Sequence, residues 1–250
     1  MNKIVNVLWT GGLDSTCRIA ELSRQEVVVQ PYYVIDRGRG SIKNELKAIS
    51  IITKIIRENQ HSKCELKDVK TIELSSLKTD ETITNAWKTF HEKYMLGSQY
   101  DWLARFAKQN DLTLEIGLEN SPRSKAMKAI LSESKLIQTK DDSISEYMID
   151  VGHSSKEAVI LFENLRIPST IWNMTKLEEV GKMKSLGLDA IIDKTWFCHY
   201  PIFGLTCGHC NPCKDALKEG MSYRVSKLGY ILGIPRAVLK RIYKFVVRRK

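Results

Sequence analysis

The sequence IVNVLWTGGLDS at residues 4–15 leads from a short apolar run into a pair of glycines. The apolar part, residues 4–9, predicts a buried strand, and residues 16–24 can continue as a helix. Adjacent glycines allow backbone angles that are closed to other residues, and a helix N-terminus offers unpaired N–H groups to an anion. The order of strand, glycine turn and helix therefore predicts a loop that binds polyphosphate.

Two other phosphate-binding patterns do not fit the chain. A Walker loop ends in Gly-Lys followed by Ser or Thr, and this tripeptide is absent from the sequence. The glycines at 38 and 40 are followed by Lys43, where the dinucleotide-binding pattern has its third glycine. The loop at 10–15 instead resembles the PP-loop of the N-type ATP pyrophosphatases, Ser-Gly-Gly-x-Asp-Ser, with Thr10 in place of the first serine. An ordinary strand-to-helix turn is the alternative.

The resemblance to PP-loop enzymes implies a role for each loop residue. Those enzymes cleave ATP between the α and β phosphates, and the loop holds the departing pyrophosphate. Asp14 is expected to orient the loop or to bind Mg2+ carried by the nucleotide. Asp14 and Ser15 are therefore candidate catalytic residues. The expected nucleotide-binding residues of the loop are Thr10, Gly11, Gly12, Leu13, Asp14 and Ser15.

A second motif, with the spacing C-x8-C-x2-C-x2-C, lies near the other end of the chain. Its members are Cys198, Cys207, Cys210 and Cys213. Turns at Gly208 and Pro212 allow the thiolates to converge, and four thiolates in a tetrahedron form a structural zinc site. Bacterial ferredoxins place their fourth cysteine downstream of the other three, whereas here it lies upstream. The motif therefore favours Zn2+ over an iron–sulfur cluster or disulfides.

The remaining cysteines and two nearby histidines have simpler interpretations. His199 and His209 are substitute ligands if one cysteine is not a ligand, and flanking polar residues otherwise. Cys17 and Cys64 are expected to be small buried or half-buried side chains.

In this order, the two motifs resemble the 7-cyano-7-deazaguanine synthase family, PP-loop enzymes that make the nitrile precursor of queuosine. The resemblance covers most of the chain and includes residues 195–213, Ile116-Gly117 and Thr175-Lys176. It implies that ATP adenylates the carboxylate of 7-carboxy-7-deazaguanine, that ammonia gives an amide, and that a second ATP dehydrates the amide. It also implies that Lys176 is catalytic and balances phosphate charge. The alternative is a solvated lysine in the first turn of a helix that a capping box formed by Thr175 and Glu178 is predicted to open.

The chain departs from the family pattern at three places. Residues 95–102 keep only the glycine of the usual Pro-Gly-Arg-Asn, residues 36–38 replace Tyr-Gly-Gln, and the Tyr-Pro-Asp-Cys-Arg stretch is missing after residue 122. ATP activation is therefore better supported than the substrate or the acyl acceptor. Diverged relatives in anti-phage operons join the deazaguanine to a protein amine through an amide, and this chain is a candidate for that group. The sequence is also compatible with a non-catalytic nucleotide-binding scaffold and with a PP-loop enzyme acting on tRNA.

Alternating strand and helix patterns predict an α/β fold. We expect a parallel twisted sheet with helices on both faces, like that of the adenine nucleotide alpha hydrolases, and a small zinc-binding C-terminal appendage. Ligands of open parallel sheets bind beyond the carboxyl ends of the strands, so Asp36 and Gly117 are expected to bind the nucleotide beside Thr10. Besides the first strand and helix, the predicted elements are strands at 27–35, 71–74 and 112–117 and helices at 41–58, 100–109 and 175–186.

The composition favours one cytoplasmic enzyme domain. At 250 residues and 43% hydrophobic content, the chain can form one large core and an appendage. The expected segments are 1–194 (PP-loop domain), 195–220 (four-Cys zinc segment) and 221–250 (basic tail). No apolar run predicts a signal peptide or a membrane partner. Clustered cysteines indicate a reducing compartment, and a homodimer is left open by the sequence.

Positive charge is concentrated at the C-terminus. The net charge is +10, and residues 221–250 hold nine basic residues and no acid, which leaves +1 for the rest of the chain. Pro235 is expected to open an amphipathic helix. We expect its apolar stripe to pack on the core, and an acidic protein or nucleic-acid partner is the alternative. The stripe is made of Ile234, Val238, Ile242, Phe245 and Val246.

Two further expectations concern the surroundings of the crevice. Residues 136–145 show little periodicity and are a candidate for a mobile loop over the site, with disorder without function as the alternative. Arg37, Arg39 and Arg123 are candidate cations for a phosphate or a carboxylate, although a surface role is the simpler interpretation of each.

Overall fold

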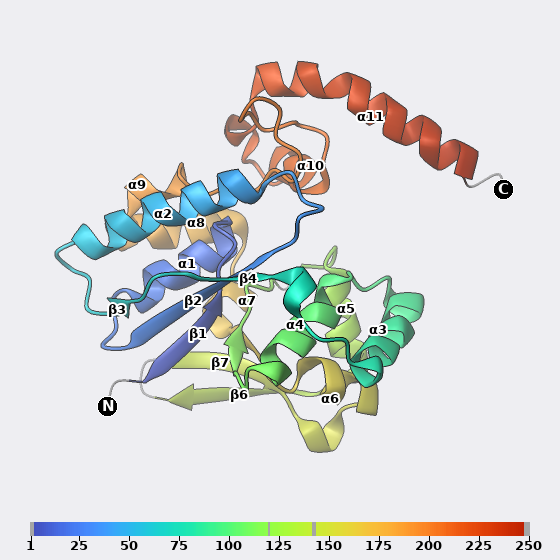
Figure 1. The fold of residues 1–250 in the computed structure, drawn as a ribbon. Helices are drawn as coiled ribbons and strands as arrows, with labels where there is room; N and C mark the ends of the chain where they lie inside the picture. The colour runs from blue at the N-terminus through green and yellow to red at the C-terminus, as the bar shows by residue number, and fades with distance from the viewer. Residues whose placement is uncertain (1–2, 120, 142–143, 248–250) are drawn as a thin grey trace.

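A mostly parallel, mixed sheet forms the centre of the protein, as Figure 1 shows. The structure is a computed structural model that describes residues 3–119, 121–141 and 144–247. The strand order is β3-β2-β1-β5-β8-β7-β6, and β4 pairs with β2. The strands are β1 (Ile4–Leu8), β2 (Val28–Ile35), β3 (Glu65–Leu66), β4 (Lys70–Glu73), β5 (Leu114–Glu115), β6 (Leu136–Asp141), β7 (Ile144–Ile149) and β8 (Leu165–Pro168).

The central strand pairing follows from the apolar runs predicted as strands. β1 pairs in parallel with β2, with Ile4 opposite Val28, and with β5 on its other side. Pro31 in β2 has no N–H to donate, and it falls between the residues that pair with β3 and those that pair with β4. The edge of β2 is therefore shared by two short strands.

Helices cover both faces of the sheet, as predicted (Figure 1). One core lies between the sheet and α1, α2, α8 and α9, and the other lies between the sheet and α3 to α6. The predicted helix at 41–58 is confirmed as α2, whose isoleucines at 49, 52 and 56 are buried. The helices are α1 (Leu13–Leu22), α2 (Ile42–Glu58), α3 (Glu81–Tyr94), α4 (Gln99–Gln109), α5 (Lys125–Glu133), α6 (Lys156–Phe162), α7 (Ser169–Trp172), α8 (Lys176–Ser185), α9 (Asp189–Ile192), α10 (Asn211–Lys218) and α11 (Lys227–Val247).

The expectation of a mobile loop at residues 136–145 is wrong. β6 and β7 form an antiparallel hairpin, with Leu136 opposite Ile149, and β7 continues the sheet antiparallel to β8. Ile144 and Ile149 are buried and hold β7 against the core, while residues 142 and 143 lie outside the described part of the chain. The segment therefore extends the otherwise parallel sheet with an antiparallel edge.

The C-terminal helix also differs from expectation. α11 begins at Lys227, so Pro235 lies inside it and does not open it. A glycine lets α11 pack closely against the metal-binding segment, because a Cβ at Gly229 would lie 2.3 Å from the carbonyl oxygen of Thr206. Ile234 and Val238 are 45% and 47% exposed, so the expected packing of the apolar stripe on the core is wrong for them. The side chains of Ile242, Phe245 and Val246 lie outside the described set.

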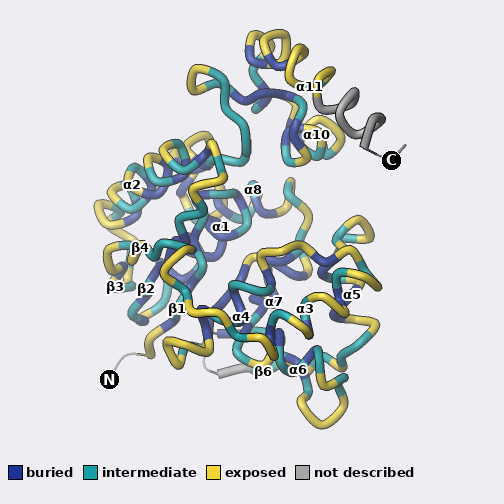
Figure 2. Tube along the Cα trace, turned by 45° about the vertical axis from the view of Figure 1, so that its right-hand side comes forward, coloured by how far each residue is buried: buried dark blue, intermediate teal, exposed yellow. Residues whose placement is uncertain are grey.

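Figure 2 shows much of the described part of α11 as exposed surface. Large apolar side chains contribute to this exposure. They are Leu228, Tyr230, Ile231, Leu232, Ile234, Val238 and Leu239. Within the described residues, no helix is both long enough and apolar enough to cross a bilayer.

Candidate active site and metal centre

A pocket of about 430 Å³ opens beside the point where the order of strand connection in the sheet reverses. β1 is followed in the chain by β2 on one side and borders β5 on the other, so the carboxyl ends of β1 and β5 flank a topological switch point. Ligands of doubly wound sheets bind at such points. The predicted site residues that line the pocket are Thr10, Gly12, Leu13, Asp14, Ser15, Gly117 and Lys176.

The loop between β1 and α1 requires glycine at its first position. Gly11 has a φ of +70°, and a Cβ there would lie 3.0 Å from the carbonyl oxygen of Glu45 in α2. Gly12 is the N-cap of α1, so the unpaired N–H groups of the first turn follow it directly. The loop therefore presents a helix N-terminus to the pocket.

Gly117 brings the end of β5 against this loop. A Cβ at Gly117 would lie 3.0 Å from the Cβ of Asp14 and 3.2 Å from the backbone nitrogen of Ser15. A larger residue would therefore push the loop away from β5. Gly117 and Thr10 line the same pocket.

Lys176 lies at the centre of a group of carboxylates. Its Nζ lies 2.5 Å from Oδ1 of Asp14, 3.0 Å from Oε2 of Glu119 and 3.6 Å from Oε1 of Glu179. The side chain is only 15% exposed, so the alternative of a solvated lysine is wrong. Burial opposes the charge, but the three carboxylates outweigh it and raise the pKa of Lys176 above its usual value. Lys176 is therefore a fixed cation beside the loop.

The N-terminus of α8 fixes Lys176 in this place. The predicted capping box is confirmed: the Glu178 carboxylate accepts the backbone N–H of Thr175 at 2.7 Å, and the Thr175 hydroxyl accepts the N–H of Glu178 at 3.4 Å. Lys176 is thus the first helical residue and points across to α1.

Glu179 is a member of this cluster that the sequence did not reveal. It is fully buried, and neither carboxylate oxygen has a hydrogen-bond partner among the described residues. Burial, together with the neighbouring Asp14, raises the pKa of Glu179 to about 9. Glu119 was missed as well. In the sequence, nothing distinguishes either acid from a surface residue. Both lie beside Lys176 only in the folded chain.

The remaining predicted site residues, one aspartate and three arginines, do not all lie at the pocket. Asp36 does not line this pocket, and its Oδ1 accepts the N–H of Gly38 at 2.9 Å in the turn after β2. Arg37 is an exposed residue paired with Glu73, and the exposed Arg123 lies 3.9 Å from Glu219. Arg39 alone of the three arginines lines the pocket, where it lies 3.7 Å from Glu45.

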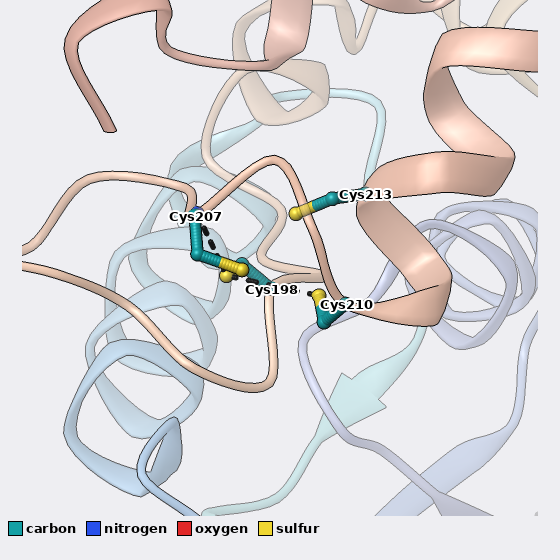
Figure 3. A group of neighbouring side chains, drawn as sticks. All are labelled: Cys198, Cys207, Cys210 and Cys213. Carbon is teal, nitrogen blue, oxygen red and sulfur yellow. Dashed lines mark hydrogen bonds between the residues drawn. The ribbon is translucent and has the colours of Figure 1, made fainter. Parts of the chain in front are cut away.

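The four cysteines lie together in one cluster (Figure 3), and all four are buried. Their sulfur atoms all lie within 4.8 Å of one another. A zinc ion with Zn–S distances of about 2.3 Å would place tetrahedral sulfurs about 3.8 Å apart, so the set fits a structural zinc site. The N–H of Cys207 donates to Sγ of Cys198 at 3.2 Å, which orders one ligand before metal binds.

His209, Cys17 and Cys64 agree with the simpler interpretations of the sequence, which gave them no part in metal binding. His209 is not part of the cluster, and its Nε2 lies 2.8 Å from the carbonyl oxygen of Tyr230. Cys17 is buried and Cys64 is half-buried. Helix α10 starts at the cluster, with Cys210 as its N-cap, and its residues Pro212, Asp215 and Ala216 line the pocket. The cysteine cluster therefore shapes one wall of the site.

The strand–loop–helix unit at the switch point, with its lysine and carboxylates, defines an ATP-using enzyme of the PP-loop class. A model of the family described as queuosine biosynthesis protein QueC matches residues 3–221. The chain belongs to this family, whose members use ATP to form C–N bonds in 7-cyano-7-deazaguanine synthase-like reactions. A search of curated proteins found no match.

Proposed function

We propose that this enzyme adenylates the carboxylate of 7-carboxy-7-deazaguanine, releases pyrophosphate and passes the acyl group to a nitrogen nucleophile. The observation that carries the proposal is the contact of Lys176 with Asp14 at the mouth of the glycine loop. A carboxylate oxygen is a poor leaving group, and its ester with AMP supplies a good one. The pocket therefore needs groups that hold a triphosphate while leaving its α phosphorus accessible.

We assign these tasks to the loop and to the cluster around Lys176. The N–H groups after Gly11 and Gly12 bind the β and γ phosphates, with Ser15 adding a hydroxyl donor. Lys176 and these donors stabilise the charge that grows on the departing pyrophosphate. Asp14 supplies carboxylate oxygen for Mg2+, with Glu119 beside it, and Mg2+ there would neutralise phosphate charge.

The three segments of the chain take separate roles in this proposal. Residues 1–194 form the PP-loop domain, residues 195–220 hold Zn2+ through the four cysteines, and residues 221–250 form the basic tail. The zinc site has no open position for catalysis because all four ligands are protein thiolates. Its task is to hold α10 against the pocket.

Mass spectrometry of the product tests this function. The protein is incubated with ATP and 7-carboxy-7-deazaguanine, with and without ammonium. The proposal expects AMP, pyrophosphate and, with ammonium, an amide or nitrile product. ATP that stays intact with every deazaguanine carboxylate would contradict the proposal.

A second candidate is the transfer of the deazaguanine to an amine of an acceptor protein in an anti-phage defence system. The observation that favours it is α11, which lies beyond the matched residues 3–221, carries exposed apolar side chains and belongs to a tail with nine basic residues and no acid. Such a helix suits a partner with an apolar groove and an acidic rim. Pyrophosphate release without ammonium, together with a protein of increased mass, would support this candidate.

Three further interpretations predict different results. A homodimer formed through α11 would give twice the mass of the monomer by light scattering. Replacing Ile231 by Lys would return the measured mass to that of the monomer. A non-catalytic scaffold would bind ATP and leave it intact. A tRNA-acting enzyme would release pyrophosphate only when tRNA is added.

A further inference from the structure

Arg224 brings a cation into the pocket from a part of the chain beyond the family match. It follows the matched residues 3–221, and it lines the same pocket as Asp14 and Lys176. Among the arginines and lysines that line this pocket, Arg39 and Lys176 each have a carboxylate neighbour. Arg224 has no ion pair with any described residue, and burial lowers its pKa.

The guanidinium of Arg224 is held in a fixed orientation. Its Nη2 donates to the carbonyl oxygen of Thr195 at 2.9 Å and to the Thr195 hydroxyl at 2.5 Å. Its Cζ lies over the ring of Phe197, 4.8 Å from the ring centroid. Both of these bonds use Nη2, and no hydrogen bond from Nε or Nη1 to a described residue is present. A half-buried, oriented cation with unused donors is suited to bind an anion.

The segment that anchors Arg224 also touches the phosphate loop. Trp196 lies between Thr195 and Phe197, and its backbone N–H donates to the carbonyl oxygen of Gly11 at 2.8 Å. Trp196 and Phe197 both line the pocket and offer aromatic surface for a planar base. Arg224 thus lies beside an aromatic surface, in the same pocket as the loop that would hold the triphosphate.

We propose that Arg224 binds the carboxylate of the acyl substrate and makes the enzyme select a carboxylate over its neutral amide. The inference rests on the proposed function. A carboxylate conjugated to a purine-like ring needs a cation next to an aromatic surface, and Phe197 with Arg224 supplies both. The planar guanidinium matches a carboxylate in a bidentate pair, whereas the triphosphate has the loop N–H groups and Lys176.

Kinetics of Arg224→Gln and Arg224→Lys test the proposal. Arg236→Gln is the matched control, because Arg236 also lies over an aromatic ring, that of Tyr200 at 4.0 Å, but does not line the pocket. We expect Arg224→Gln to raise KM for 7-carboxy-7-deazaguanine roughly 10- to 100-fold, as for loss of a charge-assisted contact, and KM for ATP less than about twofold. Arg224→Lys should recover part of the loss.

Calorimetric binding separates recognition of charge from damage to the pocket. The wild type should bind the 7-carboxylate more tightly than the neutral 7-amide, and Arg224→Gln should lose this preference while keeping its affinity for the amide. An equal loss of affinity for the carboxylate and the amide in Arg224→Gln, or a rise only in KM for ATP, would overturn the proposal. A wild type that binds the carboxylate but releases no pyrophosphate would overturn the proposed function alone. Normal turnover by Arg224→Gln would overturn this inference alone.

Discussion

The backbone N–H of Trp196 donates a hydrogen bond of 2.8 Å to the carbonyl oxygen of Gly11. This bond joins the phosphate loop to the segment that enters the cysteine cluster two residues later, at Cys198. A Cβ at Gly12 would lie 3.6 Å from the carbonyl oxygen of Trp196, so the two segments are in close contact. Loop geometry, the cysteine cluster and the pocket wall should therefore respond together to mutation.

Replacing Gly11 by alanine should weaken ATP binding at least tenfold. The φ of +70° costs an alanine about 1–2 kcal/mol, and its Cβ would lie 3.0 Å from the carbonyl oxygen of Glu45. Isothermal calorimetry with ATP measures the effect. Gly181→Ala is the control, since no atom lies within 4 Å of a Cβ there, and it should be neutral or stabilise α8 by about 0.4–1 kcal/mol. Wild-type affinity in Gly11→Ala would show that the loop does not hold the nucleotide.

Replacing Cys210 by serine should release the metal and lower both the melting temperature and the rate of pyrophosphate release. Metal binding is coupled to folding of the cluster, and α10 starts at Cys210 and lines the pocket. Elemental analysis by mass spectrometry and a thermal melt measure the two effects. Cys64→Ser, which changes a half-buried cysteine outside the cluster, should keep its metal. Unchanged metal content in Cys210→Ser would contradict the assignment of the four cysteines as metal ligands.

The stability of the protein should fall as the pH rises between about 4.5 and 9, and Glu179→Gln should reduce this fall. The pKa of Glu179 rises from 4.5 to about 9 on folding, so the native state holds a proton that the unfolded state releases in this range. One such proton changes the unfolding free energy by at most about 1.4 kcal/mol per pH unit. Urea unfolding at several pH values measures the slope. Glu163→Gln, at an exposed position, should keep the wild-type slope, and an unchanged slope in Glu179→Gln would contradict the assignment.

Replacing Gly229 by alanine should loosen α11 from the metal-binding segment. The added Cβ would lie 2.3 Å from the backbone oxygen of Thr206, and a backbone atom cannot move aside easily. Limited trypsin digestion should cut the tail of this variant faster than that of the wild type, while metal content stays the same. Leu239→Ala, at a position 67% exposed, should digest like the wild type. Equal cleavage of all three proteins would show that Gly229 is not needed to seat the helix.

The parts of the site that the sequence predicted are those with local signals. Residues 10–15 and the four cysteines carry their chemistry in short, spaced patterns, and the capping box identified the start of α8 at Lys176. Glu119, Glu179 and Arg224 belong to different segments, and only the fold brings them to the pocket or its cluster. No local pattern distinguishes them from surface residues.

The same reasoning explains the errors in the fold. The segment at 136–149 lacks the glycine or asparagine turn that usually marks a hairpin, so its strands were not predicted. α11 was expected to start at a proline, but contacts of Gly229 with the metal-binding segment extend the helix upstream to Lys227. In both places tertiary packing outweighs the local sequence signal.

The nucleotide products formed on addition of 7-carboxy-7-deazaguanine test the central claim most directly. Phosphorus NMR of the wild type with ATP should show AMP and pyrophosphate appearing in equal amounts, and Asp14→Asn, which keeps the shape of the side chain but removes the charge facing Lys176, should form neither at a measurable rate. Formation of ADP and inorganic phosphate, or full turnover by Asp14→Asn, would contradict the account.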